Sequence, residues 1–401
     1  MVNGVQNDFI FGGGLKRTSV GIMTIVKVDN YGAELQAYAT VCKLRQMGYN
    51  AEIIDYLYYK SYMFKDTAMS APLLKMGKKE SLLYWLKYRV INTLISKIGT
   101  SMILSVKNRK RRFKLFHEEN TPFSKKQYRS MDELYTNPPF YDIYITGSDQ
   151  VWNPVASSSI EPYFLTFTKS KKISYASSFG VEKIQPDLRY KIGQWLSEYA
   201  HISVREQNAC AMVKDFCGKE AVFVLDPTLL LNKEQWLQVA NKLPNIPEHY
   251  VLIYQLSTSP AIVDLARRIG KEKNIPVFRI TKRAYMVEGN DGVTNILDAG
   301  PAEFISLIDG ADYVITNSFH GTAFSVNFGK PFYSVISAKK KNNSRLESLL
   351  GLVGLSSRII KDSEDMKVLD YNYSIDFDSL QERLSRARKE SEKYLKEAIE
   401  N

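Results

Sequence analysis

Residues 312–336 (DYVITNSFHGTAFSVNFGKPFYSVI) restrict the possible fold more than any other stretch of the chain. Residues 313–316 are β-branched or aromatic, which is typical of a buried strand. After a polar turn come a short predicted helix over residues 322–328, which Gly329 ends, and a second apolar run over residues 332–336. This order of strand, turn, helix and strand predicts an open parallel sheet.

The turn in this unit contains Asn317, Ser318, His320 and Gly321. In parallel sheets, ligands bind beyond the carboxyl ends of the strands, and a helix that begins there turns unpaired N–H groups toward an anion. An imidazole next to such a site can exchange a proton near neutral pH. We therefore expect His320 to be catalytic. The alternative is that His320 caps the helix or packs in the turn.

The rest of the chain alternates strands and helices in the same way. In the N-terminal half, strands are predicted at residues 20–26, 51–55, 141–146, 172–176, 201–204 and 221–225, and helices at 33–47, 188–199 and 208–216. In the C-terminal half, further strands are predicted at 251–255 and 277–281, and helices at 261–272 and 300–309. We therefore predict an α/β fold with two Rossmann-like domains that face a cleft. The first unit has no G-x-G-x-x-G motif, so dinucleotide binding is not supported.

This alternation divides the chain into four segments. Residues 1–18 are polar and glycine-rich and are expected to be a flexible leader. Residues 19–220 and 221–375 are expected to be the two α/β domains, and residues 376–401 a charged C-terminal helix. A basic helical insertion at about residues 60–130 interrupts the first domain.

The densest run of positive charge, residues 107–114 (KNRKRRFK), follows a helix predicted at residues 81–98. Two interpretations remain open: the run is a solvated helix face, or it contacts an anionic membrane surface or a charged, lipid-linked substrate. The formal net charge of +11 favours anionic partners in general. No nucleic-acid-binding module accompanies the run, so nucleic acid is not an expected partner.

The cysteine content argues against disulfide and zinc frameworks. Cys42, Cys210 and Cys217 are the only cysteines, too few for either, and we expect no bound metal. The N-terminus lacks the basic start and apolar run of a signal peptide, and no stretch is long and uncharged enough to span a bilayer. These features predict a cytoplasmic protein.

Several polar turns follow predicted strands, and such loops build binding sites when they converge on one face. For Asn30 and Asp149 the alternative is ordinary turn chemistry, with Gly32 suited to a positive φ. For Arg205 the alternative is an ion pair with Glu206 or another nearby carboxylate. The side chains concerned are Asn30, Gln36, Ser148, Asp149, Gln150, Asn153 and Arg205.

Five motifs give the chain a likeness to a known family. They are residues 30–38 (NYGAELQAY), 141–154 (YDIYITGSDQVWNP), 202–206 (ISVRE), 226–227 (DP) and 316–321 (TNSFHG). In this order they resemble the polysaccharide pyruvyl transferase family. The resemblance implies a glycosyltransferase-B-like fold, with phosphoenolpyruvate as co-substrate and no other cofactor. It also implies a pyruvyl ketal on a saccharide, in bacterial exopolysaccharide or capsule biosynthesis. The basic region adds the expectations of a lipid-linked acceptor and of peripheral contact with the inner membrane face.

The resemblance also assigns roles to residues. Arg205 matches an arginine that holds the donor, and His320 matches the histidine at the donor site, so both are expected to be catalytic. The C-terminal domain is then the donor side, with Asn317, Ser318, Gly321 and Arg345. The N-terminal domain is the acceptor side, with Asn30, Gln36, Ser148, Asp149, Gln150 and Asn153.

One position departs from the family pattern. Many members have an arginine two residues before the histidine, where this chain has Ser318. A replacement contact for the donor is expected from Arg345, from residues 339–341, or from the helix N-terminus. This departure leaves open a non-catalytic binding protein with the same fold. A sugar-nucleotide-dependent glycosyltransferase is a further alternative, because an anion-binding helix start suits a diphosphate equally well.

Overall fold

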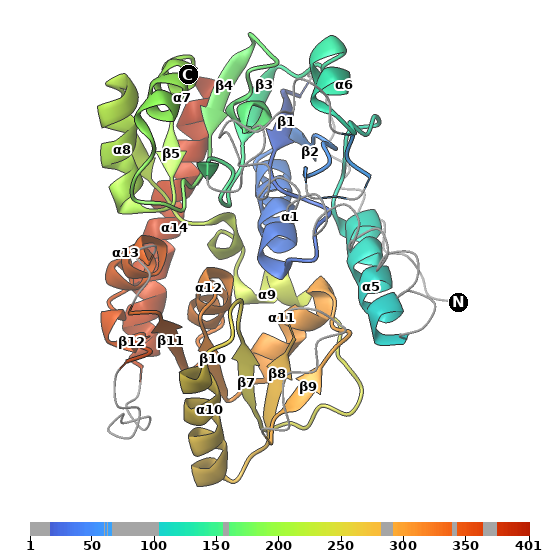
Figure 1. Ribbon diagram of the computed structural model, residues 1–401, viewed down its shortest axis with the longest axis vertical. Helices are drawn as coiled ribbons and strands as arrows, with labels where there is room; N and C mark the ends of the chain where they lie inside the picture. The colour runs from blue at the N-terminus through green and yellow to red at the C-terminus, as the bar shows by residue number, and fades with distance from the viewer. Residues whose placement is uncertain are drawn as a thin grey trace, which may run out of the picture.

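The computed structural model describes residues 17–59, 61, 63–65, 104–154, 160–281, 292–338, 343–363 and 375–401. Two α/β halves lie one above the other, with the N-terminal half at the top of Figure 1. Most of the predicted leader, the helix predicted at 81–98 and the lysines at 339–341 lie outside the described residues.

The N-terminal half is built on a parallel sheet in the order β2-β1-β3-β4. A second parallel pair, β5-β6, continues it through a bridge between Ile173 and His201. Because β6 pairs with β5, this half extends beyond the boundary expected at residue 220. The strands are β1 (Ser19–Met23), β2 (Asn50–Ile53), β3 (Ile143–Thr146), β4 (Lys171–Ser174), β5 (Ser203–Val204) and β6 (Val222–Phe223). The helices are α1 (Tyr31–Gln46), α5 (Leu104–Asn120), α6 (Met131–Thr136), η5 (Glu161–Phe164), α7 (Pro186–Ser197) and α8 (Gln207–Cys217).

The C-terminal half is built on a parallel sheet in the order β12-β11-β10-β7-β8-β9. Its strands are β7 (Val251–Tyr254), β8 (Val277–Ile280), β9 (Thr294–Ile296), β10 (Tyr313–Thr316), β11 (Phe332–Ile336) and β12 (Ile359–Lys361). Its helices are η6 (Pro227–Leu229), α9 (Lys233–Leu237), α10 (Pro260–Lys273), α11 (Pro301–Gly310), α12 (Phe319–Asn327), α13 (Ser344–Leu352), η7 (Ser356–Arg358) and α14 (Phe377–Glu400). The predicted α/β class with two parallel-sheet halves is confirmed.

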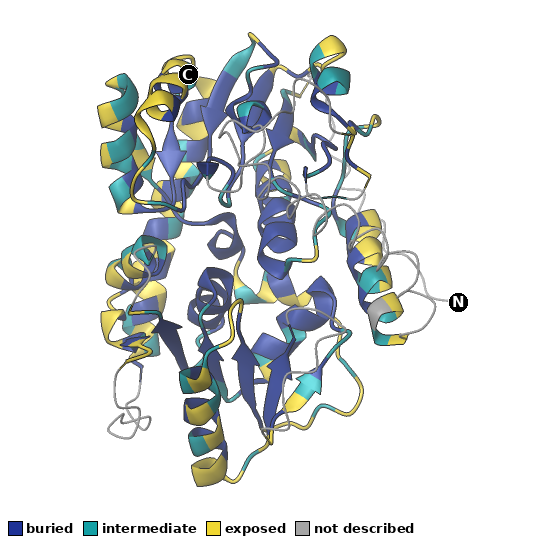
Figure 2. Ribbon diagram, viewed as in Figure 1, coloured by how far each residue is buried: buried dark blue, intermediate teal, exposed yellow. Residues whose placement is uncertain are grey.

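The central strands agree best with the sequence pattern. Figure 2 shows β7 buried along its length and β10 buried except at its first residue, and the apolar runs at 313–316 and 332–336 coincide with β10 and β11. The prediction misses β9 and β12. Both are three-residue edge strands whose residues are partly exposed, so they lack an apolar run.

The C-terminal helix α14 connects the two halves, running up the left side of Figure 1 from the lower half to the chain end at the top. About midway along the helix, Arg388 donates to the side-chain oxygen of Asn327 on α12 at 2.6 Å. Farther along, Lys43 of α1 pairs with Glu392 at 2.8 Å, and Tyr394 donates to the carbonyl of Ser174 at 3.1 Å. The helix therefore fastens both sheets to one rigid element.

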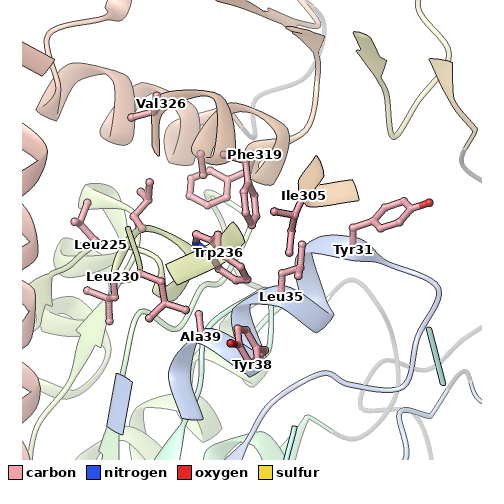
Figure 3. Close-up of a cluster of buried hydrophobic side chains, with 14 of the residues drawn as sticks. Tyr31, Leu35, Tyr38, Ala39, Leu225, Leu230, Trp236, Ile305, Phe319 and Val326 are labelled. Carbon is pink, nitrogen blue, oxygen red and sulfur yellow. The ribbon is translucent and has the colours of Figure 1, made fainter. Parts of the chain in front are cut away.

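One buried apolar cluster runs through both halves, from Ile22 on β1 to Leu252 on β7. Trp236 lies in it and contacts a ring from each half, at 5.5 Å from Tyr38 and 4.9 Å from Phe324 between centroids. Figure 3 shows this indole among side chains of α1 and α12. The halves therefore pack directly against each other around α1.

The basic run proves to have a third role. Arg109 is 2% exposed and donates to the carbonyl of Thr281 in the C-terminal half at 2.8 Å. Arg112 pairs with Asp298 at 2.9 Å. Helix α5 therefore links the halves through two of the arginines that were interpreted as solvent- or membrane-facing. No helix of the described residues is long and apolar enough to cross a membrane.

Candidate functional site

A polar centre lies where loops from both halves meet. It contains Ser148 and Asp149 after β3, Arg205 after β5, Asp226 after β6 and His320 after β10. All of these loops follow the carboxyl ends of parallel strands, so the predicted convergence is observed for these side chains.

Arg205 is the buried cation of this centre. Its side chain has no exposed surface, and its two terminal nitrogens pair with Asp149 at 3.0 Å and Asp226 at 2.9 Å. Burial opposes the charge, but the two carboxylates outweigh it and raise the pKa of Arg205. Glu206, the partner considered from sequence, instead accepts from the Ser178 hydroxyl at 2.9 Å. Direct contact between Arg205 and a donor would require one of its ion pairs to open.

Asp226 connects the members of the centre. One carboxylate oxygen accepts from Ser148 at 2.8 Å and from Arg205, and lies 3.8 Å from Nε2 of His320. The other oxygen accepts from the amide of Thr228 at 3.0 Å. Burial would raise the pKa of Asp226, but the neighbouring His320 and Arg205 and the Thr228 amide lower it below its ordinary value. Sequence reasoning treated Asp226 only as a turn residue, although it lies in one of the family motifs.

His320 belongs to the first turn of α12, not to the turn before it. The helix begins at Phe319 because Ser318 acts as N-cap, with its hydroxyl accepting from the Gly321 amide at 3.3 Å. The imidazole contacts the first turn of α1, where a Cβ added to Gly32 would lie 1.9 Å from Nδ1. Gly32 therefore serves a close approach between the halves, and the positive φ predicted for it is wrong because it lies inside helix α1.

Arg345 is the other cation near the centre. It lies in the first turn of α13, which is fixed to α8 by a hydrogen bond from the Gln207 amide to Ser348 at 3.1 Å. Arg345 is half-buried and has no ion-pair partner among the residues that the structure describes. Burial and the nearby charge of Arg205 lower the pKa of Arg345 to about 10. It therefore has the guanidinium best placed to receive an anion.

The remaining predicted residues lie around the centre. Asn317 fixes the loop after β7, accepting from the Leu256 amide at 2.7 Å, and Gly321 packs against Thr316. Asn30 caps α1 through Gly32 and Ala33. The side chains of Gln150 and Asn153 bond to each other at 2.6 Å.

Gln36 requires a correction. It was expected to bind the acceptor or line the cleft, but it is 0% exposed and donates to Thr24 and to the carbonyl of Ala33, both at 2.9 Å. It therefore has a structural role inside the N-terminal half.

Asp149 carries backbone strain at the edge of the centre. Its φ is +74°, a left-handed conformation that few non-glycine residues adopt. Its backbone carbonyl accepts from the Ser178 amide at 3.1 Å while its carboxylate holds Arg205. The strained conformation directs the carboxylate to Arg205, and the side chain retains 13% exposure.

A second buried pair lies on the other side of α1. Nδ1 of His117 on α5 is 3.2 Å from Glu34 of α1. Burial, together with the charge of Lys27, lowers the pKa of His117 from its ordinary 6.5 to about 4, and burial raises the pKa of Glu34 well above its usual value. The folded protein therefore disfavours both the imidazolium form of His117 and the carboxylate form of Glu34.

The lowered pKa of His117 predicts an acid-sensitive contribution to stability, whereas the raised pKa of Glu34 acts in the opposite direction. The unfolded chain binds a proton at His117 below about pH 6.5, whereas the folded chain resists it down to about pH 4, so the contribution of His117 to stability is lost as the pH falls through this window. From about pH 7.5 to pH 5 the loss is about 2 kcal/mol. In urea unfolding, His117→Gln should lose this part of the pH dependence, while His249→Gln at an exposed histidine should keep it. Equal pH dependence in all three proteins would contradict the prediction.

The arrangement favours anion chemistry with proton transfer. Asp149 and Asp226 share the single charge of Arg205, and Arg345, which has no ion-pair partner among the described residues, lies near enough to couple to them. The N-terminal turns of α1 and α12 meet at His320 and add favourable potential for an anion. Nε2 of His320 lies 3.8 Å from the Asp226 carboxylate, and this geometry places the imidazole to act as a general acid.

A family model described as polysaccharide pyruvyl transferase matches residues 30–338. This range contains every residue of the polar centre except Arg345. No curated protein matches the chain.

Solved structures with a similar course of chain include UDP-GlcNAc 2-epimerase from Methanocaldococcus jannaschii, at 12% identity over 96% of this chain and 100% of that one, with a TM-score of 0.47. The glycotransferase of kitacinnamycin is 12% identical over 94% of this chain and 96% of that chain, with a TM-score of 0.43. Escherichia coli heptosyltransferase WaaC is 10% identical over 92% of this chain and 99% of that chain, with a TM-score of 0.38. At such identities the likenesses do not identify a substrate.

Proposed function

Because the chain belongs to the polysaccharide pyruvyl transferase family, it is a transferase, and we propose that it moves the pyruvyl group of phosphoenolpyruvate onto hydroxyls of a saccharide. The product is a ketal on the sugar and the second product is phosphate. The proposed setting is bacterial exopolysaccharide or capsule biosynthesis in the cytoplasm, without a further cofactor. Peripheral membrane contact is proposed only for the exposed part of the basic run, Lys107, Arg111 and Lys114.

The observation that carries this proposal is Arg345, a half-buried arginine that lies near Arg205, Asp149 and Asp226 and has no ion-pair partner among the residues that the structure describes. Phosphoenolpyruvate has a phosphate and a carboxylate, and a guanidinium binds either through two parallel hydrogen bonds. Arg345 supplies such a group where the chain has Ser318 in place of the family's arginine. Arg205 instead positions Asp149 and Asp226, which keep the centre charged and ordered.

The proposed reaction needs one proton donor and two sugar hydroxyls. His320 donates its proton to the methylene carbon C3 while a sugar hydroxyl adds to C2 and gives up its proton. The second hydroxyl then attacks C2, and phosphate leaves with the C2–O bond electrons. Two C–O bonds to the sugar form, one C–O bond to phosphate breaks, and the hydroxyl protons go to His320 and to phosphate.

The proposal is tested by phosphate release from phosphoenolpyruvate in the presence of glycan acceptors. We expect release that depends on both the acceptor and His320, with none from His320→Gln. Thermal shifts with sugar nucleotides and with phosphoenolpyruvate address the glycosyltransferase alternative. Stabilisation by sugar nucleotides alone, with no phosphate release, would contradict the proposal. Binding without turnover by any acceptor would favour a non-catalytic protein.

Arg345→Ala is expected to weaken phosphoenolpyruvate binding by about tenfold or more, because a hydrogen bond to a charged group contributes about 1.5–3 kcal/mol. Calorimetric titration measures the change. Arg386→Ala, at an exposed arginine of α14 paired only with Glu382 along the helix, is the matched control and should bind as the wild type does. Equal affinity in Arg345→Ala and the wild type would rule Arg345 out as the donor contact.

A further inference from the structure

A cavity of about 620 Å³ lies between α5 and the loop from β1 to α1, apart from the polar centre. Cavities of about 300–1,000 Å³ hold small organic ligands. The side chains that matter for its chemistry are Lys27, Asp29, Lys110, Phe113, Phe123 and Gln127.

Two opposite charges in this cavity remain available. Lys110 on α5 is half-buried and Asp29 is exposed, and neither has an ion-pair partner among the described residues. An ammonium group only donates hydrogen bonds and a carboxylate only accepts them. A polyhydroxylated ligand satisfies both, because each hydroxyl can donate and accept.

The other charged groups in the cavity are already neutralised. Lys27 pairs with Asp55 at 2.6 Å, and Lys114 pairs with Glu118 at 3.5 Å. The lining therefore has no surplus of free positive charge, as a phosphate site would need. Phe113 and Phe123 supply apolar surface, and the ammonium group of Lys27 lies 4.4 Å from the centre of the Phe123 ring. Apolar and aromatic walls with a few polar groups are the usual lining of a small-molecule site.

We propose that this cavity binds a neutral saccharide unit of the acceptor, an inference that rests on the proposed transferase function. The sugar's C–H face packs on the phenylalanine rings, and its hydroxyls bond Lys110, Asp29 and Gln127. Because α5 also contacts the C-terminal half through Arg109 and Arg112, a ligand held here contacts the element that joins the halves.

The cavity and the polar centre share one loop. Asp29 lines the cavity, and Gly32, three residues later, touches His320. Three residues span at most about 11 Å. The cavity is thus linked to the polar centre through this short segment, and we assign it as a subsite for a sugar of the acceptor beyond the one that is modified.

The test is saturation-transfer NMR with four neutral disaccharides as probes: cellobiose, lactose, maltose and gentiobiose. We expect at least one to receive saturation from the wild type, and the double variant Asp29→Asn/Lys110→Gln to lower that transfer by about fivefold or more. Both substitutions are nearly isosteric and leave the apolar lining intact. Lys125→Gln, at an exposed lysine outside the cavity lining, is the matched control and should behave as the wild type does.

Three results would overturn the assignment: no probe binds the wild type, the double variant binds as well as the wild type, or inorganic phosphate binds in a Lys110-dependent way while no disaccharide does. Titration with phosphoenolpyruvate separates this inference from the proposed function. The double variant should retain wild-type affinity for it. Loss of disaccharide binding in the double variant, with no phosphoenolpyruvate binding to either protein, supports the subsite and contradicts the donor.

Discussion

Gly32→Ala is expected to lower kcat by about 100-fold or more while the protein stays folded. A Cβ at this position would lie 1.9 Å from Nδ1 and 2.3 Å from Cγ of His320, so the imidazole must move. His320 is then displaced from Asp226, which it faces at 3.8 Å, and a shift of about 1 Å at a reacting group can cost two orders of magnitude in rate.

The backbone itself accepts alanine at this position. Gly32 lies in the first turn of α1, where alanine is a better helix former by about 0.5–1 kcal/mol. The matched control is Gly351→Ala in α13, where the nearest atom to an added Cβ is 4.0 Å away. For both variants, phosphate release measures kcat and thermal unfolding measures stability, so a loss of catalysis can be told apart from a loss of folding. Wild-type kcat in Gly32→Ala would show that the position of His320 is not critical.

Arg205→Ala is expected to lower the free energy of unfolding by about 3–5 kcal/mol. The substitution leaves Asp226, with no exposed side-chain surface, and Asp149, with 13%, without their shared cation. Both carboxylates then face each other's charge in a buried site, and Asp226 loses one of the neighbours that keep its pKa low. The guanidinium also stops packing on the Phe319 ring, 4.9 Å away.

The control for this prediction is an arginine–aspartate pair on the surface. Arg189 pairs with Asp215 at 2.6 Å, with side chains 46% and 55% exposed, and Arg189→Ala should cost no more than about 1 kcal/mol. Urea unfolding measures both variants, and Arg205→Lys, which keeps the charge but loses the two-pronged geometry, should fall between them. Equal losses at Arg189 and Arg205 would mean that the buried pairs do not hold the centre together.

The strands of the fold were the part most readable from sequence. β10 and β11 lie at the predicted residues because each is a continuous apolar run inside a parallel sheet. The start of α12 was placed three residues late, at Thr322, because Ser318, His320 and Gly321 were assigned to the turn, whereas Ser318 is the N-cap and the helix begins directly after it. Ser318 holds the Gly321 amide and is itself held by Thr316 at 3.0 Å.

The site was less readable, because its contacts join residues far apart in the chain. The pairing of Arg205 with Asp226 and the packing of His320 on Gly32 are long-range contacts that no local pattern encodes. Motif matching selected most of the members and strand ends predicted their convergence. Neither the motifs nor the strand ends could show that Arg205 is buried in ion pairs with two carboxylates, or that Gln36 is buried.

The role of the basic run likewise depends on long-range contacts that the local sequence does not predict. Charge density alone predicted a solvent- or membrane-facing helix, and six of the eight residues of the run do lie exposed or half-exposed. Arg109 and Arg112 instead contact the C-terminal half, through Thr281 and Asp298. The charge pattern of a single helix does not predict which of its faces another domain will cover.

Pyruvyl transfer is tested most directly by following C2 of phosphoenolpyruvate, labelled with carbon-13, during incubation with the protein and a lipid-linked glycan fraction. We expect the label to appear in the glycan as a saturated carbon bonded to two oxygens, with one phosphate released for each label transferred, and no transfer with His320→Gln. Label that stays in phosphoenolpyruvate or appears only as free pyruvate, while a sugar nucleotide is consumed in parallel incubations, would contradict ketal formation.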